Sequence, residues 1–220
     1  MQEKEKEEVQ REQLRKDVQE INDRGRRAER AAGNAAKHLY RIVAVALLGA
    51  LVFVSSMLSV PIPVAIGDIT RIHLGNIFCL LSGFVLGPVG GGLAAGLGSA
   101  LYDLLAGGYD PLQALITFVS KFAMAWVCAV AAGPRREGKG GLVRDYAACF
   151  LGSVAYIALY MLKSYVYKSF VEPVPADTLG AVLLGKLIPA LLNGAVAVLV
   201  TPLLARAMFP ALRRAGVLEK

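Results

Sequence analysis

The positions of the basic residues relative to the apolar stretches constrain this chain more than any other feature. Six apolar stretches follow residue 40, and each has about the length that a helix needs to cross a bilayer, the second being slightly short. These predicted spans are 41–60, 73–88, 89–106, 112–132, 146–167 and 179–204. Six spans predict an all-α integral membrane bundle in which both chain ends lie on the same side of the membrane.

The basic residues indicate which side that is. Of the 24 Lys and Arg residues, 11 lie in 1–41, four in 134–145 and four in 206–220. The other connections hold only Arg71 and Lys168. Because cation-rich connections stay in the cytoplasm, both termini and the connection 134–145 are predicted to be cytoplasmic. The net charge of +7 therefore reflects topology and contact with anionic lipid, and we expect no nucleic-acid partner.

The same patterns divide the chain into three parts. Residues 1–40 are predicted to form a charged helical tail, 41–207 the membrane domain and 208–220 a cytoplasmic C-terminal tail. The N-terminal tail carries a thin apolar stripe of Val9, Leu14, Val18 and Ile21. That stripe is too short to define a coiled coil. We expect a solvated helix, with docking to a cytoplasmic partner as the alternative.

Neither metal chemistry nor catalysis is expected from this sequence. Cys79, Cys128 and Cys149 all fall in apolar spans without a Cys-x-x-Cys pair, and such cysteines usually act as small hydrophobic residues. The glycine-rich run 90–99 is not followed by the Gly-Lys-Ser/Thr of a phosphate-binding loop. We therefore expect no cofactor, no metal and no enzyme activity, and any ATP hydrolysis would need other chains.

Ionisable and polar side chains within the spans predict a ligand site, because such groups at membrane depth are costly unless they are paired or hydrated. Their order along the spans places them in one leaflet, the outer one. Lysines outnumber acids there, so a net-cationic cavity that opens outward is expected. The predicted site residues are His73, Asn76, Asp103, Lys121, Tyr156, Tyr160, Lys163, Lys186 and Asn193.

Two helical faces define the chemistry of this predicted site. Tyr156, Tyr160 and Lys163 share one face of the fifth span, and Lys186 and Asn193 share one face of the sixth. Tyrosines beside an amine suit a flat or heteroaromatic ligand that bears a carboxylate or another acceptor. Alternatives remain open: an interfacial aromatic belt for the tyrosines, snorkelling for the lysines, and a structural ion pair for the aspartate of the third span.

Short motifs across the second and third spans resemble a known family. The chain is similar to the S component, the substrate-binding subunit, of energy-coupling factor (ECF) vitamin transporters, over residues 40–207. The motifs that carry the resemblance are Arg71-Ile-His-Leu-Gly-Asn76, Leu86-Gly-Pro-Val-Gly-Gly-Gly92 and Gly96-Leu-Gly-Ser-Ala-Leu-Tyr-Asp103. In the first span, Ala46 and Ala50 match the small-residue motif that S components place against their transmembrane coupling protein.

The resemblance implies a function and a set of partners. It implies a six-helix bundle in a prokaryotic plasma membrane, with the loop after the first span as a lid over an outward-facing vitamin site. A transmembrane coupling protein and two cytoplasmic ATPases would complete the importer, while the tail 1–37 inherits no role. The cationic cavity favours an anionic or acceptor-rich ligand such as pantothenate or folate, and a neutral pyrimidine or pyridoxine-type precursor stays open. A self-sufficient carrier and a membrane scaffold are the alternatives; a carrier would usually show internal repeats, and none is convincing here.

Overall fold

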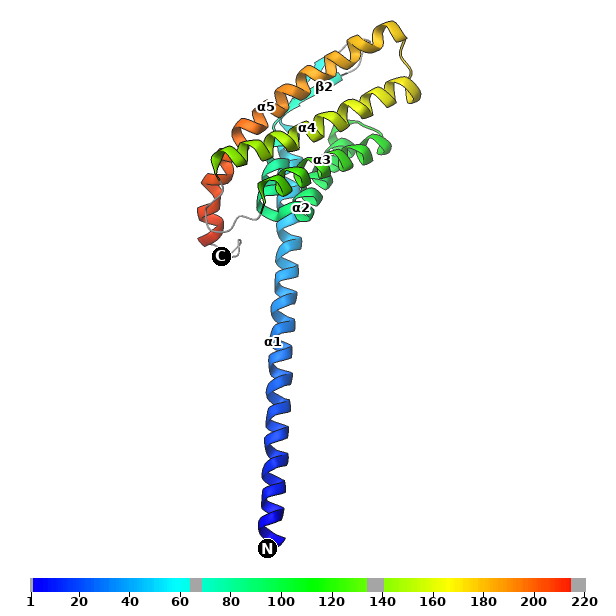
Figure 1. Cartoon of the computed structure of the whole chain (residues 1–220). Helices are drawn as coiled ribbons and strands as arrows, with labels where there is room; N and C mark the ends of the chain where they lie inside the picture. The colour runs from blue at the N-terminus through cyan, green and yellow to red at the C-terminus, as the bar shows by residue number, and fades with distance from the viewer. Residues whose placement is uncertain (1, 64–68, 134–140, 215–220) are drawn as a thin grey trace. The chain divides into compact units, whose positions relative to one another are not determined.

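The structure, a computed structural model, describes residues 2–63, 69–133 and 141–214. These residues are mostly helical, which confirms the predicted all-α class (Figure 1). The helices are α1 Gln2–Met57, α2 Gly75–Tyr102, α3 Pro111–Ala132, α4 Leu142–Val166 and α5 Ala176–Arg214. The shorter elements are the strands β1 Ser59–Pro63 and β2 Ile69–His73 and the π-helical turns η2 Asp103–Gly107 and η3 Tyr167–Val171.

The chain forms two compact units. Met1–Val43 is one and Ala44–Lys220 is the other. Within the described residues of the first unit the chain is a single helical segment. The second unit holds the end of α1 and every later element, and α5 continues to Arg214, past the predicted end of the membrane domain at 207.

The described residues contain five helices that are long and apolar enough to cross a membrane, where the sequence predicted six spans. The five are Leu14–Met57, Gly75–Gly107, Pro111–Ala132, Leu142–Val171 and Ala176–Pro210. Apart from residues 73 and 74, which precede the helix, the predicted spans 73–88 and 89–106 both correspond to Gly75–Gly107, because α2 continues from the first span into the second and η2 follows it directly.

A reversal inside α2 explains the difference between six predicted spans and five helices. Gly87 has a φ of 75° and a ψ of −172°, and Pro88, which has no N–H to donate, follows it. The Sγ of Cys79 lies 3.7 Å from the Oγ of Ser99. A straight helix would separate residues so far apart in sequence by about 30 Å. The two limbs of α2 therefore lie side by side as a helical hairpin, and each limb corresponds to one predicted span.

Glycines allow the backbones of the second unit to approach closely. A Cβ on Gly83 of α2 would lie 2.5 Å from the backbone oxygen of Ala125, and one on Gly152 of α4 would lie 2.6 Å from that of Met124. Helix α3 thus packs between α2 and α4 at backbone distance, as small residues permit in lipid. The side chains of Leu80, Met124, Cys79, Cys128 and Cys149 are fully buried in the core.

A short β-hairpin replaces the loop expected after the first span. Helix α1 ends at Met57, and β1 pairs antiparallel with β2 so that Ser59 lies opposite His73 and Pro63 opposite Ile69. The β-branched residues of the two strands favour extended backbone. The prolines of β1 had instead suggested a loop, because proline cannot donate a backbone hydrogen bond. Residues 64–68 of the loop predicted after the first span, and 134–140 of the cation-rich connection, lie outside the described residues.

Candidate functional site

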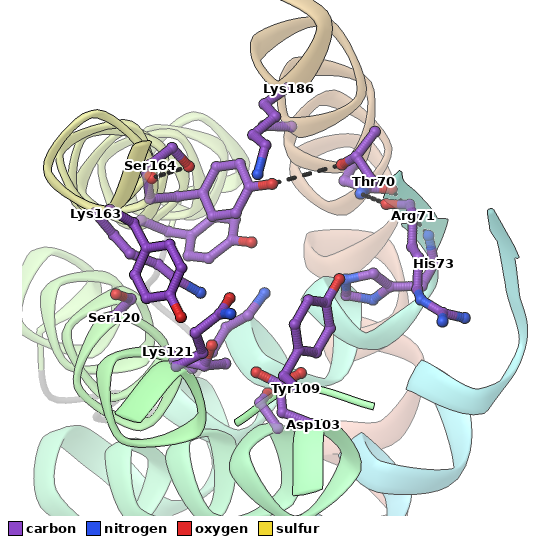
Figure 2. A pocket seen from close by; sticks show the side chains of 18 of the residues that line it. Thr70, Arg71, His73, Asp103, Tyr109, Ser120, Lys121, Lys163, Ser164 and Lys186 are labelled. Carbon is purple, nitrogen blue, oxygen red and sulfur yellow. Dashed lines mark hydrogen bonds between the residues drawn. The ribbon is translucent and has the colours of Figure 1, made fainter. Parts of the chain in front are cut away.

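A polar cavity lies among β2, η2 and the helices of the second unit, and Figure 2 shows many of its side chains. Eight of the nine predicted site residues line it, and the ninth, Asn76, lies directly behind it. The eight are His73, Asp103, Lys121, Tyr156, Tyr160, Lys163, Lys186 and Asn193. The fold therefore brings together residues that span more than half of the chain.

A buried lysine forms part of the cavity wall. The side chain of Lys121 on α3 is almost fully buried, and its Nζ donates a hydrogen bond to the Oδ1 of Asn76 on α2. The same ammonium group lies 3.7 Å from the ring centroid of Tyr156 on α4. An amide oxygen and an aromatic face together offset part of the cost of burying an amine. Asn76 thus contacts a cavity lysine and is not itself part of the cavity lining.

Two tyrosines give the cavity a flat aromatic surface. The rings of Tyr156 and Tyr160, four residues apart on α4, stack with their centroids 5.8 Å apart and their planes at 26°. The hydroxyl groups of Tyr160 and Thr70 lie 3.5 Å apart, which brings the ring next to β2. Such a surface suits another flat ring system, which would stack on it or meet it edge to face.

Cations outnumber acids among the residues that line the cavity. Figure 2 shows Lys121, Lys163 and Lys186 extending toward the cavity from three different helices. The lining also includes Arg71 and Lys168 on the positive side and Asp103 and Glu172 on the negative side. Because Lys168 and Glu172 pair with each other at 2.8 Å, the remaining lining is still net positive.

Asn193 on α5 holds the strand β2 in place. The backbone N–H of His73 donates to the Oδ1 of Asn193 at 3.1 Å, and the Nδ2 of Asn193 donates to the backbone oxygen of Arg71 at 2.9 Å. One carboxamide thereby replaces the strand neighbour that β2 lacks on this side. The sequence predicted Asn193 as a ligand contact, and the structure shows its two amide atoms engaged with the backbone of β2.

The His73 ring is neutral at the edge of the cavity. Burial, and then the charges of Lys121 and Arg71, lower the pKa of His73 to about 3. Its Nδ1 accepts a hydrogen bond from the backbone N–H of Gly75 at 3.1 Å, so that nitrogen carries no proton. The proton of the neutral ring is then assigned to Nε2, which makes His73 a hydrogen-bond donor.

One carboxylate joins two segments that line the cavity, through Gln113 and Tyr167. Asp110 caps the N-terminus of α3 by accepting the backbone N–H of Gln113 at 3.0 Å, and it also accepts the hydroxyl of Tyr167 in η3 at 2.8 Å. The hydrogen bond from the Gln113 backbone, followed by that from Tyr167, lowers the pKa of Asp110 to about 2. The ionised carboxylate therefore fixes the start of α3 to the start of η3, directly after α4.

Comparison with known proteins gives a family for the chain. The family model of the ECF-type riboflavin transporter, S component, matches residues 37–209. The chain belongs to this family. The match confirms the resemblance inferred from the motifs of the second and third spans.

A solved structure supports the fold of this S component. It is described as the structure and mechanism of the S component of a bacterial ECF transporter. Its sequence is 21% identical, the match covers 78% of this chain and 96% of that chain, and the TM-score is 0.55. A comparison with curated proteins gives no match.

Membership of the family establishes the general role of the chain. S components are substrate-binding subunits of prokaryotic ECF transporters, and they act in the membrane with the other transporter components. The five long apolar helices of the described residues agree with that location. The choice between a transport subunit and a membrane scaffold is thereby resolved in favour of the transport subunit.

Reasoning from sequence missed many polar residues that line the cavity of this S component. They are Ser56, Thr70, Arg71, Ser99, Tyr102, Tyr109, Gln113, Thr117, Ser120, Ser164, Tyr167, Lys168 and Glu172. One signal was available: Gln113 and Thr117 lie on the same face of α3 as Lys121. A neutral hydroxyl in a membrane helix otherwise gives no signal, because it so often bonds to its own helix, as Ser164 does to the Tyr160 carbonyl at 2.8 Å.

The predicted partner-binding face of the S component is exposed. Ala46 and Ala50 lie one helical turn apart on α1, and both are accessible in the second unit. Leu48, which lies between the two alanines, and Val52, which follows them, are instead buried in the core. The contact with a coupling protein stays a prediction.

Proposed function

We propose that this S component binds riboflavin in the polar cavity, from the outer side of the membrane, and delivers it to an ATP-driven importer. The observation that carries the proposal is the stacked pair Tyr156 and Tyr160 beside the amine of Lys121. The name of the matching family adds the identity of the vitamin.

The chemistry of riboflavin fits this lining. Its isoalloxazine ring system is flat and can stack on the tyrosine surface. The ring carbonyls and nitrogens are acceptors for the ammonium groups of Lys163 and Lys186 and for the Nε2–H of His73. The hydroxyl groups of its ribityl chain match the Ser, Thr and Gln side chains of the cavity wall. A neutral ligand with many hydrogen-bond acceptors can thus bind the cationic side chains of the cavity without carrying a negative charge.

Binding to the purified protein tests the vitamin. The chain would be purified in detergent, and ligand that co-purifies would be identified by absorbance and mass spectrometry. Added riboflavin is expected to lose its fluorescence as it binds, because a flavin stacked on tyrosine is quenched. Pantothenate and folate, the anionic ligands that the cavity charge also favours, serve as competitors. Binding of either one without binding of riboflavin would contradict the proposal.

The transport partners belong to the same proposal. We infer that a transmembrane coupling protein docks on the face of Ala46 and Ala50, that two ATPases lie in the cytoplasm, and that both termini of this chain are cytoplasmic. The alternative, a self-sufficient carrier, predicts accumulation of riboflavin in vesicles that contain this chain alone. The proposal predicts binding but no accumulation under those conditions.

A further inference from the structure

We propose that residues 14–42 of the N-terminal tail form a parallel two-stranded coiled coil with the same residues of a second copy of this chain. The inference concerns the first unit only. It goes beyond the proposed function and does not depend on it.

An apolar seam runs along the tail with the spacing of a coiled coil. Its positions follow one another in alternating steps of four and three residues, which is the heptad repeat. The seam consists of Leu14, Val18, Ile21, Gly25, Ala28, Ala32, Ala35, Leu39 and Ile42. The sequence analysis recognised only the first part of this seam, as the stripe that includes Leu14, Val18 and Ile21. In the structure α1 continues through Gly25 and Gly33, so the seam extends over four heptads.

The seam is exposed within the first unit. Its large side chains, those of Leu14, Val18, Ile21, Leu39 and Ile42, are between 51% and 68% exposed. The small residues between them are exposed as well. Burial of large apolar side chains at regular heptad positions under a second helix lowers the free energy of the pair. The Ala and Gly residues in the middle of the seam let the two backbones approach closely.

The charges beside the seam favour a second copy as the partner. In heptad terms Arg24 occupies a g position and Glu29 the following e position, so a parallel pairing places Arg24 of one chain opposite the partner's Glu29, twice by symmetry. The exposed ion pair that Arg24 makes with Glu20 at 2.6 Å within one helix contributes little and does not prevent this. Segment 1–41 has 11 basic and nine acidic residues, so two tails do not repel strongly.

The parallel direction follows from the membrane. Chains that insert with the same orientation carry their tails on the same side, so their α1 helices enter the membrane in the same sense. An antiparallel pair of tails from one membrane would require one of them to turn back.

Disulfide cross-linking of the full chain in lipid vesicles, with no other protein present, tests the seam. Ala28→Cys and Ala35→Cys place a thiol on the seam, whereas Arg30→Cys and Lys37→Cys place one at the outward f positions. The native cysteines are buried in the core, and the unchanged chain gives the background. We expect about tenfold more cross-linked dimer from the seam positions, because a disulfide requires Cβ atoms about 4 Å apart. Equal yields at all four positions, or none at the seam, would overturn the proposal.

A charge swap tests the pairing partner and the direction. In the Ala28→Cys chain, Arg24→Glu or Glu29→Arg places like charges opposite each other and should lower the yield of dimer severalfold. The double change Arg24→Glu with Glu29→Arg restores opposite charges and should restore the yield. Failure of the double variant to recover, with each single variant still reduced, would overturn the parallel pairing. A tail that instead docks on a different protein would give no seam-specific dimer in these vesicles.

Discussion

Lys121 of α3, in the cavity wall, donates a buried hydrogen bond to Asn76 of α2, which lies behind that wall. The side chain of Asn76 is fully buried, and that of Lys121 is 3% exposed. Asn76 lies outside the cavity lining and is left without a partner when Lys121 is lost, so the pair links the stability of the bundle to the shape of the site.

The first prediction concerns this pair. Lys121→Met and Asn76→Leu should each lower the free energy of unfolding by about 1–3 kcal/mol, because each leaves a buried polar group without its partner. The double variant should lose less than the sum of the two, by about 1 kcal/mol. Thermal unfolding of the four proteins in detergent measures this coupling. Strictly additive losses would mean that the hydrogen bond contributes nothing to stability.

The second prediction concerns Asn193 as the anchor of β2. Asn193→Leu removes two hydrogen bonds to the strand and should weaken ligand binding by about tenfold, since each bond contributes roughly 1 kcal/mol. The neighbouring change Leu192→Ala, at a half-exposed position, serves as the control.

Amide hydrogen exchange distinguishes anchoring from direct ligand contact. The backbone N–H of His73 should exchange faster in Asn193→Leu even without ligand, because its acceptor is gone. A loss of affinity with unchanged exchange at His73 would show that Asn193 acts on the ligand itself.

The third prediction concerns the cations of the cavity. Lys186→Met and Lys163→Met keep a similar side-chain volume and should each weaken binding by roughly ten- to a hundredfold, the effect of losing one charge-assisted contact. Lys37→Met in the tail is the matched control. If both changes, alone and combined, leave affinity unchanged in a folded protein, the ligand is held mainly by the tyrosines.

The fourth prediction concerns coupling to the transporter. Ala46→Trp with Ala50→Trp should abolish uptake in cells and leave ligand binding to the purified protein intact, because large side chains prevent close approach of a partner helix. Leu47→Trp with Leu51→Trp, on a different exposed face of α1, should leave uptake unchanged. Parallel loss of uptake and binding would instead mean that the alanine face packs within the subunit.

The fifth prediction concerns orientation. In intact cells a membrane-impermeant thiol reagent should label Asp177→Cys, at the start of α5, and should not label Gly141→Cys, just before α4. Both positions are exposed, and the native cysteines are buried, so background labelling is low. Labelling of Gly141→Cys from outside would reverse the proposed topology.

The sequence predicted the membrane helices well because hydrophobic length is a strong signal. It did not predict that the second and third spans form one element, since the reversal depends on the backbone of Gly87. Nor did it predict the β-hairpin, where Pro61 and Pro63 suggested a loop although both lie in β1. Short strands of this kind are specified by pairing across the hairpin, which single-sequence periodicity does not reveal.

The candidate site was predicted to the extent that its residues are unusual in lipid. Lys121, Lys186 and Asp103 were found because a charge within a span demands an explanation. Thr70 and Ser120 were not found, because a hydroxyl in a helix or strand is common. The role of Asn193 also escaped the sequence, since its partners are backbone atoms of a strand that is distant along the chain.

The reversal at Gly87 also has a consequence for biosynthesis. Cys79 and Ser99, which contact each other across the hairpin, are only 20 residues apart in the chain. The whole hairpin, from Asn76 at the start of one limb to Asp103 at the end of the other, is likewise one short stretch of chain. Once residues up to Gly107 have left the ribosome, the chain contains both limbs of this hairpin and the contacts between them can form. The aromatic and cationic wall comes later, from α3, α4 and α5. Synthesis therefore completes the residues of this side of the binding chamber before it makes those of α3, α4 and α5.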